Sequence, residues 1–192
     1  MVFWTTYLFG AWLLAMKDVQ VNWLDERKQV LNIQMVGGDA LAGTCLKSGL
    51  ELEYRYSVQI CKRRPLWLDS CTKSWERSQI LSYDPITIKY RLLIDTFDDR
   101  AEAETQIFES RNRALAGLRQ ARGMPLTSLA EKAAELLSNR RTYLTVRVQS
   151  NCKGDYNETL AKLSSFLSLG FVQIAGFDTG WVDFNVGSEI RR

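Results

Sequence analysis

The chain has 192 residues, a length that favours one domain, and its 46% hydrophobic and 24% charged residues are ordinary for a globular protein. Its formal net charge of +3 is too small to indicate a nucleic-acid partner, and we expect none. Because the chain contains no histidine, Ser-His and Cys-His nucleophile pairs and histidine metal sites are excluded.

The N-terminal segment 1–16 has no charged side chain, and the chain turns polar abruptly at Lys17 and Asp18. As a helix this segment would span about 24 Å, short of the roughly 30 Å hydrocarbon core of a membrane, so its length is typical of a signal-peptide apolar region. No Lys or Arg precedes it, and Leu13 and Ala15 form only a passable cleavage site. An uncleaved membrane anchor and a buried N-terminal strand or helix are the alternatives. We expect residues 17–192 to form a single domain.

Alternation of apolar and polar residues predicts about seven antiparallel strands after this segment. The pattern is clearest at residues 50–60, which should have one buried and one solvated face. It recurs at 19–23, 31–35 and 86–94, and residues 75–82 form a further strand before a turn at Asp84 and Pro85. The last strands are expected at 143–150 and 181–186.

Three helices are expected in the second half of the chain. The first begins near Ser110 and ends at Gly123 and Pro125, which are typical helix-ending residues. The second and third cover 128–138 and 155–169. Their apolar residues recur at helical spacing, so each helix has one face that can pack on a sheet. The sequence therefore predicts an α+β fold in which three helices pack on an antiparallel sheet.

The four cysteines are an even number, which fits disulfide bonds in an exported protein. Cys61 ends one predicted strand and Cys71 begins the next, so we expect these two residues to bond across the neck of a hairpin. The second bond, between Cys45 and Cys152, follows by elimination. The alternative is four reduced thiols buried in a cytosolic core.

The tip of this hairpin combines basic and apolar residues, and it is the candidate binding site. Lys62, Arg63 and Arg64 precede Trp67, which is flanked by two leucines. An exposed tryptophan beside guanidinium groups can anchor at an anionic membrane surface or fill a pocket of a protein partner. Alternatively, Trp67 folds back over the sheet and the arginine stems lie along it.

The sequence gives little sign of catalysis or of a cofactor. It contains no GxSxG nucleophile elbow, and neither a GxxxxGK nor a GxGxxG phosphate-binding loop. A crowded set of carboxylates fits a solvated turn better than the acid pair of a hydrolase, which is the weaker alternative: Asp95, Asp98, Asp99, Glu102 and Glu104. We therefore expect a non-catalytic protein without a metal or a cofactor.

The stretch from Leu50 to Leu92 contains an Arg-Pro and tryptophan hairpin tip, followed by the sequence LSYDPITIKY at 81–90. In these features the chain resembles an uncharacterised bacterial family of exported proteins, domain of unknown function number forty-three ninety (DUF4390). The family pattern also has a signal segment, helices and a C-terminal tryptophan strand, to which Trp181 and Phe184 correspond. The resemblance implies a role in the envelope, linked to a membrane-bound sensor kinase, but it implies no activity.

These observations predict an exported or membrane-tethered protein of the periplasm or cell envelope that acts as a non-catalytic binding or adaptor domain. Its partner would be a protein or an anionic membrane surface. The alternative is a structural subunit of an envelope assembly, whose sign would be a large exposed apolar patch.

Alkaline phosphatase fused after Arg192 tests the expected export. Since this enzyme is active only after its disulfide bonds form outside the cytoplasm, the full-length fusion should be active. The same fusion without residues 1–16 is the control and should be inactive. A stable but inactive full-length fusion would contradict export.

Overall fold

The computed structural model describes residues 19–25, 30–37, 39–65, 68–72, 74–96, 103–125, 141–153 and 176–185. The N-terminal segment 1–16 and the helices expected at 128–138 and 155–169 lie outside these ranges, as does Trp67. Within the described ranges, no helix has both the length and the apolar character needed to cross a membrane.

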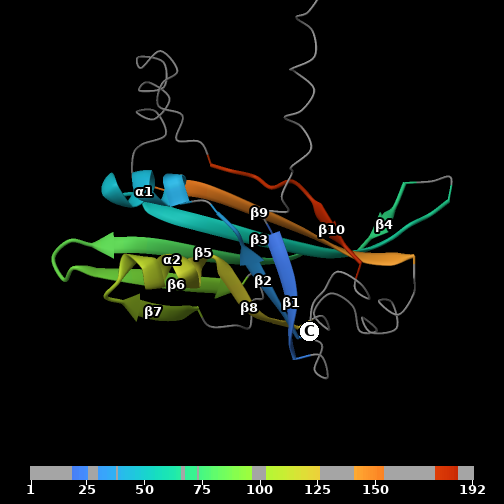
Figure 1. Cartoon of the computed structure of the whole chain (residues 1–192), viewed down its shortest axis with the longest axis horizontal. Helices are drawn as coiled ribbons and strands as arrows, with labels where there is room; N and C mark the ends of the chain where they lie inside the picture. The colour runs from blue at the N-terminus through green and yellow to red at the C-terminus, as the bar shows by residue number, and fades with distance from the viewer. Residues whose placement is uncertain are drawn as a thin grey trace, which may run out of the picture.

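A seven-stranded antiparallel sheet is the main element of the fold (Figure 1). Its strand order is β10-β9-β3-β5-β6-β7, and β4 pairs with β3 beyond the end of β5. The strands are β3 (Glu51–Lys62), β4 (Ser70–Cys71), β5 (Trp75–Asp84), β6 (Lys89–Thr96), β7 (Glu104–Phe108), β9 (Thr142–Lys153) and β10 (Val182–Phe184). Every neighbouring pair is antiparallel, so the predicted antiparallel sheet is confirmed.

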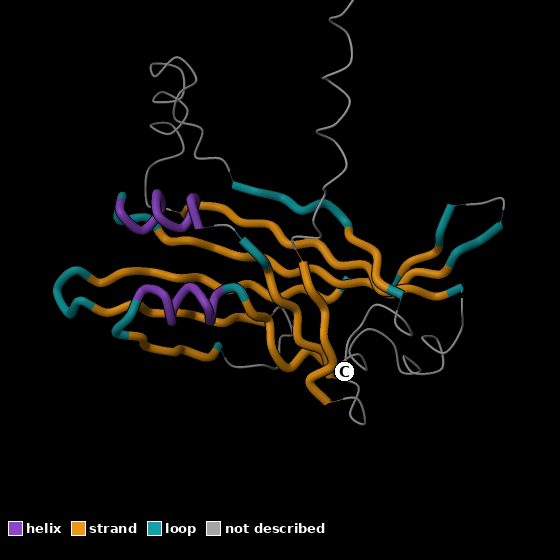
Figure 2. The backbone as a smooth tube through the Cα atoms, viewed as in Figure 1, coloured by secondary structure: helices purple, strands orange, loops and turns teal. Residues whose placement is uncertain are grey.

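A smaller antiparallel sheet and two helices lie against one face of the large sheet (Figure 2). The smaller sheet has the order β1-β2-β8, and its strands are β1 (Val19–Asp25), β2 (Val30–Met35) and β8 (Gln120–Pro125). The helices are α1 (Asp39–Lys47) and α2 (Arg111–Leu118), of which α2 is the helix expected near Ser110. The described part of the chain is therefore predominantly β, with two helices where three were expected.

Two elements of this layer were not predicted, and both contain glycine. Helix α1 includes Gly43, which lowers its helix propensity, but it buries Cys45 and Leu46 in the core and is stabilised by that packing. Strand β8 occupies the stretch where Gly123 and Pro125 were expected to end a helix. Gly123 has a φ of 76° at an irregularity in the pairing with β2, a backbone conformation that glycine adopts without strain.

The strand expected at 86–94 begins later than predicted, because residues 85–88 form a turn. Asp84 Oδ1 accepts a hydrogen bond from the backbone N–H of Ile86 at 2.9 Å, and its Oδ2 accepts one from Thr87 Oγ1 at 2.8 Å. These bonds stabilise the turn. Ile86 and Ile88 consequently lie in solvent, 91% and 68% exposed, and their assignment to the strand was wrong.

The core lies between the large sheet and the layer formed by α1, α2 and the smaller sheet. Leu52, Tyr54, Tyr56 and Val58 of β3 are all buried on this face, as the alternating pattern predicted. The hydroxyl of Tyr56 donates a hydrogen bond to the backbone carbonyl of Leu118 at 2.7 Å. It thereby satisfies a carbonyl at the end of α2 and fixes this helix on the sheet.

Two disulfide bonds reinforce the fold. One joins Cys45 of α1 to Cys152 of β9, with Cα atoms 5.6 Å apart, and the other joins Cys61 to Cys71. Both pairs are those expected from the sequence. The first connects residues 107 positions apart, and in the chain-entropy model closing a loop of that length contributes about 4–5 kcal/mol.

The opposite face of β3 was expected to be solvated, but Glu53 and Ser57 are only 3% and 5% exposed. Glu53 Oε1 accepts a hydrogen bond from Ser78 Oγ at 2.7 Å, and it lies 3.0 Å from Lys153 Nζ and 3.5 Å from Arg55 Nη2. Burial is the largest single influence on this carboxyl and raises its pKa. The hydrogen bonds and positive charges of its three neighbours together outweigh burial and lower the pKa below its ordinary value. The ionised carboxylate thus links β3, β5 and β9.

Glu53→Gln should lower the free energy of unfolding at neutral pH by about 1–2 kcal/mol, since glutamine loses the charge that faces Lys153. The folded pKa of Glu53 is depressed, so its contribution is present above the ordinary value of 4.5 and is lost as the pH falls through the folded pKa. Urea unfolding should therefore show the two proteins converging in acid. Glu51→Gln, at an exposed position of the same strand, is the control and should unfold like the wild type. Equal stability of the Glu53→Gln variant and the wild type at neutral pH would contradict this role.

Candidate functional site

The candidate site is an arm, described at residues 60–65 and 68–72, that projects from one end of the large sheet (Figure 1). Strand β3 pairs with β9 as far as Lys62, but its pairing with β5 ends at Val58. Its last two residues pair instead with β4, where Cys61 lies opposite Cys71 and Lys62 lies opposite Ser70. The arm is therefore a direct continuation of the strand at the centre of the sheet.

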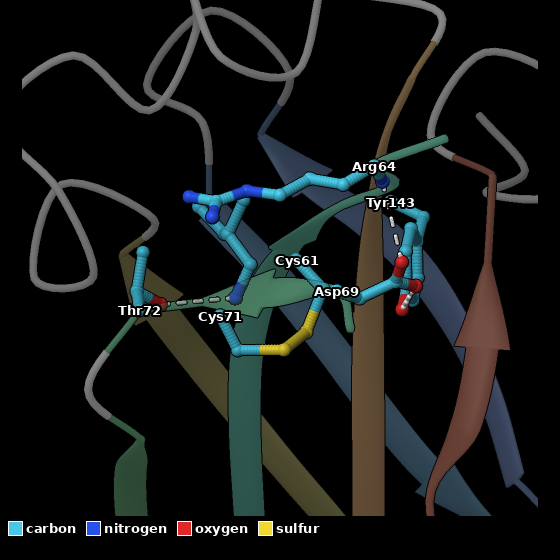
Figure 3. The surroundings of a disulfide bond; sticks show 7 residues. Cys61, Arg64, Asp69, Cys71, Thr72 and Tyr143 are labelled. Carbon is cyan, nitrogen blue, oxygen red and sulfur yellow. Dashed lines mark hydrogen bonds between the residues drawn. A yellow bond between two sulfur atoms is a disulfide. The ribbon is translucent and has the colours of Figure 1, made fainter. Parts of the chain in front are cut away.

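The neck of the arm is closed by a covalent bond and by two hydrogen bonds (Figure 3). The disulfide between Cys61 and Cys71 joins directly opposed residues whose Cα atoms are 4.0 Å apart. The N–H of Ile60 donates to Thr72 Oγ1 at 3.1 Å, and the N–H of Thr72 donates to the carbonyl of Ile60 at 2.9 Å. Without this closure, a pair of strands this short would be only marginally stable.

Asp69 connects the tip of the arm to β9 (Figure 3). Its Oδ2 accepts a hydrogen bond from the hydroxyl of Tyr143 at 2.6 Å, and its Oδ1 accepts one from the N–H of Arg64 at 3.4 Å. The bond to the Asp69 carboxylate holds the phenol proton and raises the pKa of Tyr143 to about 12, with further contributions from burial and from the negative charge of Asp183. We call this pair of contacts the Asp69 clamp.

Three adjacent cations lie on the arm. Lys62, Arg63 and Arg64 are all exposed, and Leu68 on the returning side of the tip is 92% exposed. The guanidinium of Arg63 lies over the ring of Tyr143, 5.2 Å from its centroid, a cation–π geometry. Three of the four predicted site residues are thus exposed on the arm, as is the apolar side chain of Leu68. The fourth, Trp67, lies outside the described residues.

The carboxylates considered for a hydrolase do not form a described pair. Asp95 follows Ile94 in β6, and Ile94 is the residue paired with Glu104 of β7. Since successive residues of a strand point to opposite faces, Asp95 and Glu104 lie on opposite faces of the sheet. Asp98, Asp99 and Glu102 fall outside the described residues. Within the described part of the chain, no three metal-ligating side chains cluster.

The sequence did not reveal Asp69 and Tyr143 as site residues. Tyr143 opens a predicted strand and carries no local sign of a partner, because Asp69 is 74 positions away. The contact arises from the register of β3 with β9, which places Tyr143 opposite Cys61. The only signal that could have indicated it is the expected disulfide, which fixes where the arm begins.

The chain matches the model of a known family. The model of a family described as Domain of unknown function (DUF4390) matches residues 38–153, more than half of the chain and including the whole arm. No curated protein and no solved structure matched the chain.

Asp69→Asn should lower the pKa of Tyr143 from about 12 toward its ordinary value of 10.0, because an amide holds the phenol proton less strongly and adds no negative charge. A titration of the tyrosine ring carbons by NMR measures it. Asp84→Asn, which removes a carboxylate from the turn at the end of β5, is the control and should leave Tyr143 unchanged. A Tyr143 pKa that stays near 12 in the Asp69→Asn variant would disprove the clamp.

Proposed function

This chain belongs to the family described as Domain of unknown function (DUF4390), and we propose that it acts as a non-catalytic binding domain of the bacterial cell envelope, with the arm as its binding surface. The observation that carries this proposal is the combination of exposed cations and an exposed leucine on a covalently closed hairpin. Arginine is among the residues enriched at the energetic centres of protein interfaces.

A protein with an acidic surface is the partner that the arm favours. The Cys61–Cys71 bond and the Asp69 clamp hold the backbone of the arm before binding, so docking costs little conformational entropy. Specific docking gains from this preorganisation, whereas adsorption to anionic lipid requires only positive charge and an apolar group. A membrane-bound sensor kinase is the candidate partner that the family resemblance suggests.

The two disulfide bonds support a location in the envelope. Disulfides persist in oxidising compartments such as the periplasm and are rare in the cytosol. The uncharged segment 1–16 supports the same proposal, because it has the length of an export signal.

Arg64→Ala combined with Leu68→Ala should abolish partner binding and leave the thermal midpoint close to that of the wild type, since exposed substitutions have small effects on stability. The matched control is Arg91→Ala combined with Ile86→Ala, which removes the same kinds of side chain from β6 and from the turn before it. The two aliphatic positions are equally exposed, 92% for Leu68 and 91% for Ile86. The control should bind like the wild type.

Photocrosslinking in intact cells measures the binding. A benzophenone amino acid at position 68 should give one protein adduct, which disappears when Arg64→Ala is added, and the same probe at position 86 should give none. Arg64-dependent binding to anionic vesicles without any protein adduct would replace the protein partner with a membrane surface. An adduct that persists in folded Arg64→Ala protein would rule out the arm as the binding surface.

A further inference from the structure

A second concave region lies away from the arm, between the large sheet and α2. Its volume is about 410 Å³, within the range of sites that hold small ligands. One wall is the face of β5, β6 and β7, and the other is α2 with the start of β8, which Figure 2 shows lying over these strands. Arg77, Gln79, Ile94, Glu104, Gln106, Phe108, Arg113, Ala116, Gly117, Gln120 and Arg122 line it.

The cavity is cationic. Three of its lining residues are arginines, Arg77, Arg113 and Arg122, whereas Glu104 is the only carboxylate among the described residues that line it. Arg77 is partly buried, and this burial lowers the pKa of its guanidinium, an effect that the charge of Glu104 opposes. Its Nη1 donates to the carbonyl of Arg122 at 2.5 Å, while its Nε has no hydrogen-bond partner among the described residues. A desolvated guanidinium with unused donors gains most from an anion that brings acceptor oxygens.

Gln79 favours a ligand that donates a hydrogen bond, whereas Arg77 favours one that accepts hydrogen bonds. Its side chain is 1% exposed, and its Nε2 donates to the backbone carbonyl of Gln120 at 3.1 Å, which fixes the orientation of the amide. The other polar atom of the amide, Oε1, is buried and has no donor among the described residues. A buried amide oxygen without a donor is costly, so this position favours a ligand with an N–H group.

Part of the remaining lining is apolar. Ile94 and Phe108 contribute from the sheet, and Ala116 and Gly117 contribute from α2. A Cβ atom at Gly117 would lie 3.2 Å from the ring of Phe108, so glycine allows the helix to approach the sheet closely here. This wall can contact the hydrocarbon part of a ligand.

We propose that this cavity binds the carboxyl-terminal residue of a peptide that ends in an apolar side chain. The carboxylate accepts hydrogen bonds from the arginines, the terminal peptide N–H donates to Gln79 Oε1, and the apolar side chain packs against Ile94 and Phe108. Inorganic anions satisfy only the first of these requirements, and apolar molecules satisfy only the last. The proposal goes beyond the arm, which uses different residues at another end of the sheet.

Calorimetric titration of the full-length, disulfide-bonded chain tests the proposal. The probe is acetyl-alanyl-leucine with a free carboxylate, and its carboxamide is the matched ligand. The free acid should bind saturably and the amide at least about tenfold more weakly, the effect of one lost charge-assisted hydrogen bond. Arg113→Gln, at an exposed position of α2, should weaken binding of the acid by about tenfold, whereas Arg91→Gln, at an exposed position outside the cavity, should not.

Arg77→Gln provides a second variant, with its fold checked by circular dichroism, and should also weaken binding of the acid. Equal binding of acid and amide would overturn the proposal, and so would wild-type affinity in the folded Arg113→Gln protein. Inorganic phosphate that competes as strongly as the dipeptide would show an unspecific anion site and would also overturn it. None of these outcomes depends on whether the arm binds a partner.

Discussion

The pairing of β3 with β9 is the constraint on which the other features depend. These strands are in register over all twelve residues of β3, whereas β5 pairs with only seven of them. Because β9 supports β3 beyond the end of β5, the last residues of β3 extend past the sheet without losing their backbone hydrogen bonds on one side. The arm exists because of this difference in length, and the same register brings Tyr143 of β9 within reach of Asp69. A slip of one residue would turn Tyr143 to the other face.

Strand β3 is buried on both faces, although its alternating sequence predicts one solvated face. On one face Tyr54 and Tyr56 lie in the core, and on the other Glu53 is equally buried but is held by Ser78 and Lys153. An isolated buried carboxylate would be destabilising, so these partners are what permits a charge at this position. The polar face is thus an ordered network that joins three strands, and Cys152 ties the same region of β9 to α1.

Most strands could be predicted because alternation is a local signal, and the hairpin disulfide could be predicted because Cys61 and Cys71 are close in sequence. Helix α1 and strand β8 could not, since packing and pairing override the weak propensities of their glycines. The burial of Glu53 and the Asp69 clamp depend on neighbours that only strand register supplies. The cavity lined by Arg77 and Gln79 is the feature that sequence predicts least, because it requires α2 to lie across β5, β6 and β7.

The arm and the cavity are supported by different parts of the sheet, and this separation has a physical basis. The arm depends on β3, β4 and β9, whereas the cavity is built on β5, β6 and β7 with α2 and β8. Strand β5 connects them, because it begins at Trp75, shortly after the arm ends, and the guanidinium of Arg77 lies 5.3 Å from the centroid of the Trp75 ring. Arg64 and Arg113 share no partner among the described residues. The effects of substitutions at these two positions on the free energy of unfolding should therefore be additive. Trp75 is the position at which a structural change in the arm could affect the cavity, or the reverse, because it belongs to the strand that connects the two.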